Sequence, residues 1–170
     1  MKRAIYLILI ASFILSCSES KETEATELVQ EAAVEELEEM MEPTFDSLKA
    51  YEYGADEYGM KQYVMAFLKK GPNRDRDSSE AYDLQMAHME NIGKMADEGK
   101  LVLAGPFMDD GEIRGIYIFN VKTVEEAKAL TETDPAIQAG SLVMELIPWY
   151  GSAALVGVND EHKRVSKKSF

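Results

Sequence analysis

Apolar positions between residues 79 and 98 recur every three or four residues, which is the spacing of one face of an amphipathic helix. Ser78 or Ser79 suits the N-cap, and Gly99 suits the left-handed position that commonly follows a helix. This face includes His88, one of two histidines in the chain. We therefore expect the His88 side chain to point toward whatever the helix packs against. The face consists of Ala81, Leu84, Gln85, His88, Met89, Ile92, Met95 and Ala96.

Strand patterns lie on either side of this helix. They cover residues 62–68, 101–104, 113–121 and 142–149. A second helix begins after Thr123, where Thr-Val-Glu-Glu forms a capping box with Glu126. Asp134-Pro135 opens a short helix that ends near Gly140.

This order of elements, β-α-β-β-α-β, is typical of the ferredoxin-like fold. The sequence therefore predicts an α+β domain at residues 59–150, with a four-stranded antiparallel sheet that carries its helices on one face. The apolar side chains on the opposite face of the sheet must also be buried, and we expect a homodimer or the C-terminal extension (residues 151–170) to bury them. Within that extension, residues 151–158 are apolar enough to pack, whereas residues 161–170 are expected to fray.

The first residues of the chain have the layout of a secretory signal. Met1-Lys2-Arg3 is positive, and the apolar run at residues 5–14 is too short to span a membrane. The sequence ILSC at its end resembles the lipobox of bacterial lipoproteins, which implies cleavage after residue 16 and lipidation of Cys17. The alternative is an ordinary cleaved signal with an incidental cysteine. We expect an envelope protein that is anchored to a membrane through Cys17.

Charge is concentrated in residues 17–58. Fourteen acidic residues and two lysines give this stretch a net charge of −12, out of −13 for the whole chain. Self-repulsion extends such a segment, so we expect a largely disordered tether between the anchor and the domain. No basic face is available to neutralise phosphates, which argues against nucleic-acid binding.

Several of these features occur together in a known family. The helix with His88, the strand LVLAGP, the hairpin, the Glu-Glu-Ala helix and the segment TDPAIQAG resemble the YCII-related domain family over residues 62–148. The resemblance implies a dimeric ferredoxin-like fold related to dimeric α/β barrels. It also implies a His–Asp active-site pair at His88 and Asp134. One branch of the family is linked to dehydrochlorination of a chlorinated hydroxyquinol.

His88 and Asp134 each have two interpretations. Imidazole exchanges protons near neutral pH, so His88 suits general acid–base catalysis, and a carboxylate from Asp134 would orient it. Alternatively, His88 is a core histidine with locally satisfied nitrogens, and Asp134 is an ordinary helix N-cap. Both roles are compatible for Asp134, because a capping carboxylate has a second oxygen. Arg114 and Tyr117 are weaker candidates for ligand contact.

No other motif indicates chemistry. The sequence has no phosphate loop, no dinucleotide fingerprint and no set of residues with metal-ligand spacing, so we expect neither a cofactor nor a metal. The sequence therefore predicts a lipid-anchored protein of the bacterial cell envelope. Its domain would be a cofactor-independent lyase or isomerase that uses a His–Asp dyad on a small organic molecule. The alternative is a non-catalytic module that binds a small molecule or a protein.

Overall fold

The computed structural model of the chain describes residues 44–168. The predicted signal peptide, Cys17 and most of the acidic stretch lie outside these residues. Of the described helices, none is long and apolar enough to cross a membrane.

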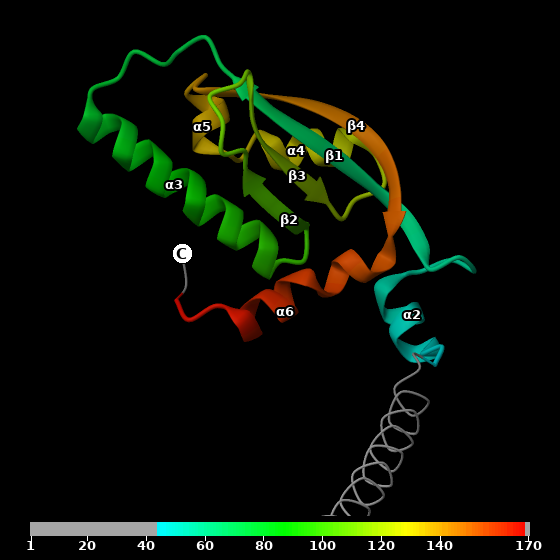
Figure 1. Ribbon diagram of the computed structural model, residues 1–170. Helices are drawn as coiled ribbons and strands as arrows, with labels where there is room; N and C mark the ends of the chain where they lie inside the picture. The colour runs from blue at the N-terminus through cyan, green and yellow to red at the C-terminus, as the bar shows by residue number, and fades with distance from the viewer. Residues whose placement is uncertain (1–43, 169–170) are drawn as a thin grey trace, which may run out of the picture. The chain divides into compact units, whose positions relative to one another are not determined.

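Four strands form one antiparallel sheet in the order β2-β3-β1-β4 (Figure 1). Helix α3 connects β1 to β2, whereas α4 and the short α5 connect β3 to β4. This is the predicted α+β, ferredoxin-like arrangement, which is thereby confirmed. The elements are β1 (Met60–Lys70), α3 (Ser78–Asp97), β2 (Leu101–Pro106), β3 (Ile113–Phe119), α4 (Val124–Thr131), α5 (Pro135–Gln138) and β4 (Leu142–Ser152).

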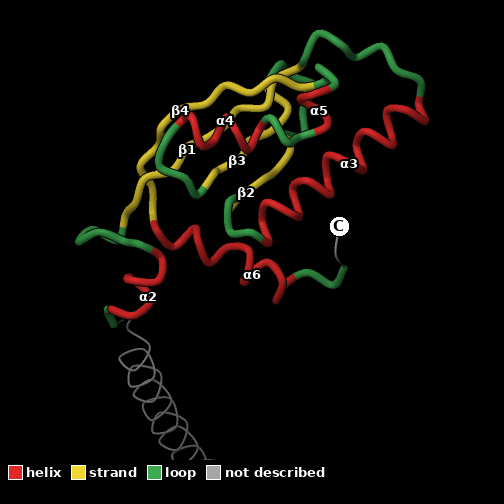
Figure 2. Tube along the Cα trace, turned by 180° about the vertical axis from the view of Figure 1, so that it is seen from behind, coloured by secondary structure: helices red, strands yellow, loops and turns green. Residues whose placement is uncertain are grey.

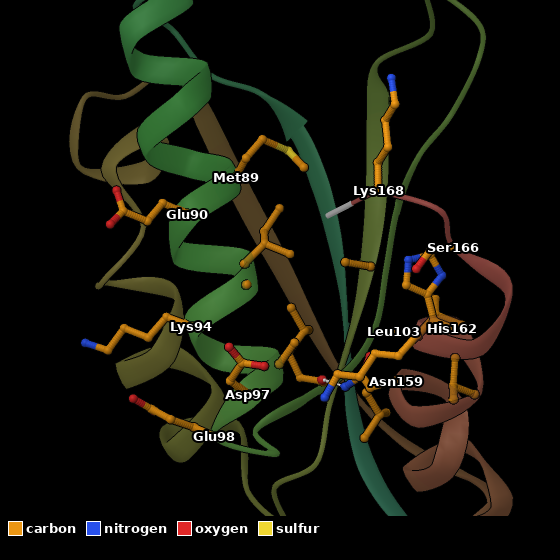
Figure 3. A pocket seen from close by; sticks show the side chains of 18 of the residues that line it. Met89, Glu90, Lys94, Asp97, Glu98, Leu103, Asn159, His162, Ser166 and Lys168 are labelled. Carbon is orange, nitrogen blue, oxygen red and sulfur yellow. Dashed lines mark hydrogen bonds between the residues drawn. The ribbon is translucent and has the colours of Figure 1, made fainter. Parts of the chain in front are cut away.

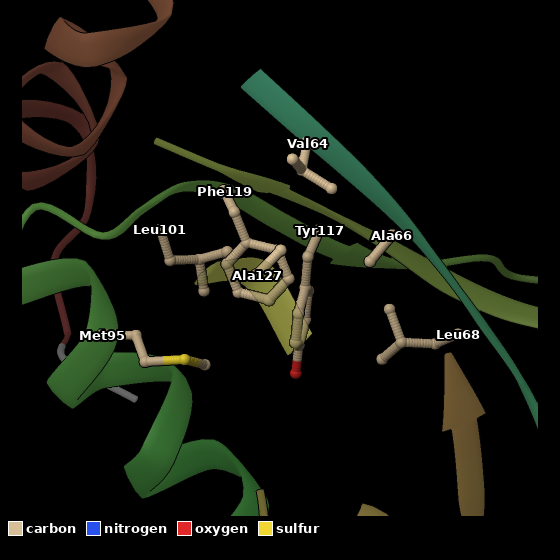
Figure 4. Packing of buried hydrophobic residues seen from close by; sticks show 8 residues of the cluster. All are labelled: Val64, Ala66, Leu68, Met95, Leu101, Tyr117, Phe119 and Ala127. Carbon is tan, nitrogen blue, oxygen red and sulfur yellow. The ribbon is translucent and has the colours of Figure 1, made fainter. Parts of the chain in front are cut away.

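The main core lies between the sheet and its helices. Alternate residues of β1 and β3 face the helices, because side chains alternate between the two faces of a strand. Met95 from α3 and Ala127 from α4 contact the same cluster, so both helices cover one face of the sheet (Figure 4). The buried members are Val64, Ala66, Leu68, Met95, Leu101, Tyr117, Phe119 and Ala127.

The opposite face is partly covered by the C-terminal segment, as one of the two sequence-based alternatives predicted. The 3-10 helix η1 (Ala153–Gly157) packs Leu155 and Val156 against a second cluster on this face. The Tyr63 hydroxyl donates a hydrogen bond to the carbonyl oxygen of Ser152, the N-cap residue of η1, at 3.0 Å. Residues 151–158 therefore pack onto the sheet.

Helix α6 (Val158–Val165) follows η1 and corrects the prediction that residues from 161 onward fray. Acidic residues occupy its first turn and basic residues its last, which matches the helix dipole. The ion pair between Arg164 and Glu161 (2.9 Å) adds local support. Asn159 Nδ2 donates to Leu101 O at 2.8 Å. Helix α6 is thereby joined to β2, and the two elements lie side by side in the backbone trace (Figure 2).

A helix also forms before the predicted domain start at residue 59. Helix α2 (Ser47–Tyr53) is capped by Asp46 and ends at Gly54, whose φ of +67° is left-handed. Lys61 Nζ on β1 donates to Tyr53 O at 2.9 Å. Residues 47–53, which charge alone assigned to the tether, are therefore helical.

Helix caps explain where α3 and α4 begin. The N-cap of α3 is Asp77, which accepts from the N–H groups of Ser79 and Glu80, so the predicted cap at Ser78 or Ser79 was wrong by one or two positions. Gly99 has the expected positive φ of +66°. The capping box of α4 has both of its predicted hydrogen bonds.

Candidate functional site

Three elements bring polar side chains together inside the helix-covered core. His88 comes from the middle of α3, Asp134 is the N-cap residue of α5, and Tyr117 comes from β3. The Nδ1 atom of His88 lies 2.9 Å from Asp134 Oδ1 and 2.8 Å from Asp134 Oδ2. The Nε2 atom on the other side of the ring lies 3.3 Å from the Tyr117 hydroxyl. The structure therefore brings the two sequence-predicted residues into direct contact.

Asp134 performs two structural tasks at once. Its Oδ1 accepts a hydrogen bond from Ala136 N at 2.8 Å, which caps α5, and its carboxylate also contacts the His88 ring. The Asp134 side chain is fully buried, with an exposed fraction of 0 %. An ionised carboxylate only accepts hydrogen bonds, so its contact with Nδ1 places a proton on that nitrogen. In neutral His88, Nε2 then keeps its lone pair.

Tyr117 faces that lone pair. Its ring stacks on the His88 ring with centroids 6.2 Å apart, and Phe119 is its edge-to-face neighbour at 5.7 Å. Burial, followed by the negative charge of Asp134, raises the pKa of the Tyr117 hydroxyl far above its ordinary value. The phenol therefore stays protonated at neutral pH and serves as a hydrogen-bond donor.

His88 and Tyr117 also line a pocket of about 510 Å³. His88 has an exposed fraction of only 7 %, so the pocket is its route to solvent and to a ligand. Much of the wall is apolar and includes Leu84, Ile92 and Leu142. A pocket of this size suits a small organic molecule.

A wider groove of about 1080 Å³ lies between α3, β2 and α6 (Figure 3). Its lining includes Met89 and Lys94 of α3 and Asn159 and His162 of α6. The groove includes neither His88 nor Asp134. We therefore assign the candidate site to the smaller pocket, which His88 and Tyr117 line.

Arg74, Arg76 and Arg114 line the same small pocket. Of these, only Arg114 was considered from the sequence, because Arg74 and Arg76 belong to a charged loop with no motif. Within residues 44–168, no group of three or more His, Cys, Asp or Glu side chains is arranged to hold a metal ion. The pocket lining itself supplies an imidazole, a phenol and three guanidinium groups.

Comparisons with known proteins give one family assignment. None of the curated proteins matches the chain significantly. A solved structure of 5-chloro-2-hydroxyhydroquinone dehydrochlorinase from Burkholderia phenoliruptrix AC1100, in complex with 2,5-dihydroxybenzoquinone, is 18 % identical. It aligns over 51 % of this chain and 90 % of its own, with a TM-score of 0.37. The YCII-related domain matches residues 60–150, which is more than half of the chain. This chain therefore belongs to the YCII-related domain family.

Proposed function

We propose that this protein is a cofactor-independent lyase or isomerase that moves a proton on a small organic molecule. One observation carries the proposal: His88 contacts buried Asp134 through Nδ1, while its Nε2 faces Tyr117 at a ligand-sized pocket. General acid–base catalysis requires an imidazole that a carboxylate orients through one nitrogen and whose other nitrogen a ligand can reach, here by taking the place of the Tyr117 hydroxyl at Nε2.

The proposed reaction begins when Nε2 accepts a proton from an acidic C–H or O–H bond of the ligand. The electron pair of that bond stays on the ligand, and the Asp134 carboxylate stabilises the imidazolium that forms. The imidazolium then returns the proton at another atom, which completes an isomerisation. In an elimination, the electron pair instead forms a double bond while the leaving group departs with the electron pair of its own bond, and the imidazolium gives its proton to the leaving group or to water. Once the ligand has taken its place at Nε2, the protonated Tyr117 hydroxyl, which also lines the pocket, can donate to a ligand oxygen that gains charge.

Exchange of substrate protons with deuterated water tests this proposal without knowledge of the product. Ligands are first selected from hydroxylated and chlorinated quinols and small oxo acids by NMR shift changes at His88 and Tyr117. We expect the protein to exchange a proton of at least one bound compound, and His88→Gln to slow this by roughly 100-fold or more. His162→Gln, at the only other histidine, is the control.

Two outcomes would contradict the catalytic proposal. In one, compounds bind at the pocket but none exchanges a proton faster than in buffer. In the other, exchange proceeds equally well in His88→Gln. Either result favours a non-catalytic module in which the His88–Asp134 contact is structural.

We also propose that the chain is lipid-anchored at Cys17 in the bacterial cell envelope. The support is the apolar segment at residues 5–14, followed by ILSC, which contains the only cysteine of the chain. Expressed in a bacterium that processes lipoproteins, the protein should incorporate labelled palmitate, and Cys17→Ala should not. An unmodified Cys17 thiol in the mature protein would contradict the anchor.

We further propose a homodimer through the part of the sheet that η1 leaves open. Val143 and Ile147 of β4 lie on the same face as Trp149, and each has an exposed fraction of 42 %. A second copy would remove this apolar surface from water. A mass of one chain by light scattering at micromolar concentration would contradict it.

A further inference from the structure

Arginine side chains from two separate segments meet at the pocket of His88. Arg74 and Arg76 lie on the loop between β1 and α3, and Arg114 lies on β3. The loop is held against the end of α5 by two main-chain hydrogen bonds, from Gly71 N to Ser141 O and from Asn73 N to Gly140 O, both 2.9 Å long. At Gly71, a Cβ would lie 2.2 Å from Gly140 O, so glycine permits this approach.

The three guanidinium groups bind neutral acceptors. Arg74 Nη1 donates to Ser141 O at 3.2 Å, Arg76 Nη2 to Ala139 O at 2.7 Å, and Arg114 Nη1 to Asp109 O at 2.7 Å. All three acceptors are main-chain carbonyl oxygens.

Two carboxylates close to these arginines in sequence make hydrogen bonds to main-chain N–H groups. The Asp77 side chain caps α3, and the Asp109 side chain accepts from Gly111 N. Among the described residues, the ion pairs involve other side chains, and none joins a pocket arginine to a carboxylate. Three arginines therefore line one small pocket whose described lining contains no carboxylate.

The rest of the pocket limits what the arginines would bind. Its apolar wall suits a hydrocarbon or aromatic body, and its volume of about 510 Å³ excludes a large polymer. Guanidinium groups pair best with planar oxyanions, because their N–H groups form a fork that matches the two oxygens of a carboxylate.

We propose that this pocket selects a small organic carboxylate, with the carboxylate bound by Arg74 and Arg114 and the apolar or aromatic body lying beside His88. This inference rests on the proposed function for its choice of pocket and names the substrate class. Arg76 is a positioning residue, because it contacts the carbonyl oxygens of both Asn73 and Ala139 and so joins the loop to α5.

Benzoate and its uncharged isostere benzamide are the probes for this proposal. We expect NMR titrations to show saturable benzoate shifts at His88 and Tyr117, with an affinity at least about tenfold above that of benzamide, since charge-assisted hydrogen bonds are roughly twice as strong as neutral ones. The preference should decrease as salt rises. Arg74→Gln and Arg114→Gln should each reduce the preference for benzoate over benzamide. Arg74→Lys should keep more of this preference than Arg74→Gln does, because lysine retains the positive charge.

Arg164→Gln is the matched control, because Arg164 lies on α6, pairs with Glu161 and does not line the pocket. It should leave the preference for benzoate unchanged. Equal affinities for the two probes, no saturable benzoate binding, or an equal loss in Arg164→Gln would each overturn the proposal.

The same titration separates this inference from the catalytic proposal. In His88→Gln the preference for benzoate should persist, because it depends on the arginines. Suppose instead that His88→Gln loses the preference for benzoate while Arg74→Gln and Arg114→Gln both keep it. The imidazole would then be the group that binds the anion, and the inference would be overturned. Absence of proton exchange with a retained preference would contradict catalysis alone.

Discussion

Asp134→Asn should reverse the tautomer of neutral His88 while leaving α5 capped. In the variant, the asparagine oxygen can still accept from Ala136 N, as Asp134 Oδ1 does now at 2.8 Å. The amide NH₂ then takes the place of Oδ2, which lies 2.8 Å from His88 Nδ1. An NH₂ group donates, and the remaining oxygen, 2.9 Å from Nδ1, is also engaged by Ala136 N, so we expect Nδ1 to become the acceptor and the ring proton to move to Nε2. The atom that faces the pocket is then no longer a base.

The expected consequence is a loss of proton exchange by roughly 10³- to 10⁴-fold, the scale seen when a serine-protease histidine is held in the wrong tautomer. Nitrogen-15 NMR of the ring reports the tautomer directly, and the exchange assay reports the rate. Asp77→Asn is the matched control, because Asp77 also caps a helix but lies outside the dyad. Wild-type exchange in Asp134→Asn, or a similar loss in Asp77→Asn, would contradict the proposed orienting role.

Phe119→Ala should have the largest effect on stability. Phe119 is completely buried at the centre of the main core and packs edge-on against Tyr117 with ring centroids 5.7 Å apart. Truncation of a buried phenylalanine lowers the free energy of unfolding by roughly 3–5 kcal/mol, through lost burial and the cavity that remains. Because Tyr117 loses its neighbour, the contact with His88 should also become looser.

Urea unfolding followed by circular dichroism measures this effect. Phe107→Ala is the matched control, since Phe107 lies after β2 with an exposed fraction of 43 %. Its unfolding free energy should change by no more than about 0.5 kcal/mol. If Phe119→Ala and Phe107→Ala lower the free energy of unfolding by the same amount, the main core does not lie where the structure places it.

The local sequence patterns predict the elements of this fold well. The 3.6-residue period placed His88 on the buried face of α3, and the Asp-Pro pair placed Asp134 at the start of α5. Their contact could not follow from these patterns, because it joins residues 46 positions apart through the packing of α5 against α3. The family resemblance, rather than periodicity, supplied that pairing.

The misplaced boundaries have physical causes. Asp77, Ser78 and Ser79 are all good N-cap residues, and the extended backbone at Asp77 decides between them. Helix α6 was missed because its support comes from η1 and from the hydrogen bond to β2, neither of which is visible in a short, charged sequence. Arg74 and Arg76 were missed because the carbonyl oxygens that orient them belong to residues 139 and 141.

The most direct test of the central claim is the tautomer of His88 in the unmodified protein. With ring nitrogens labelled with nitrogen-15, and His162→Gln to assign the two histidines, the spectrum is recorded at a pH where the ring is neutral. We predict a proton on Nδ1 and none on Nε2, which leaves a base facing the pocket. A proton on Nε2 instead would show that Asp134 does not prepare His88 for proton abstraction, and the catalytic proposal would be contradicted.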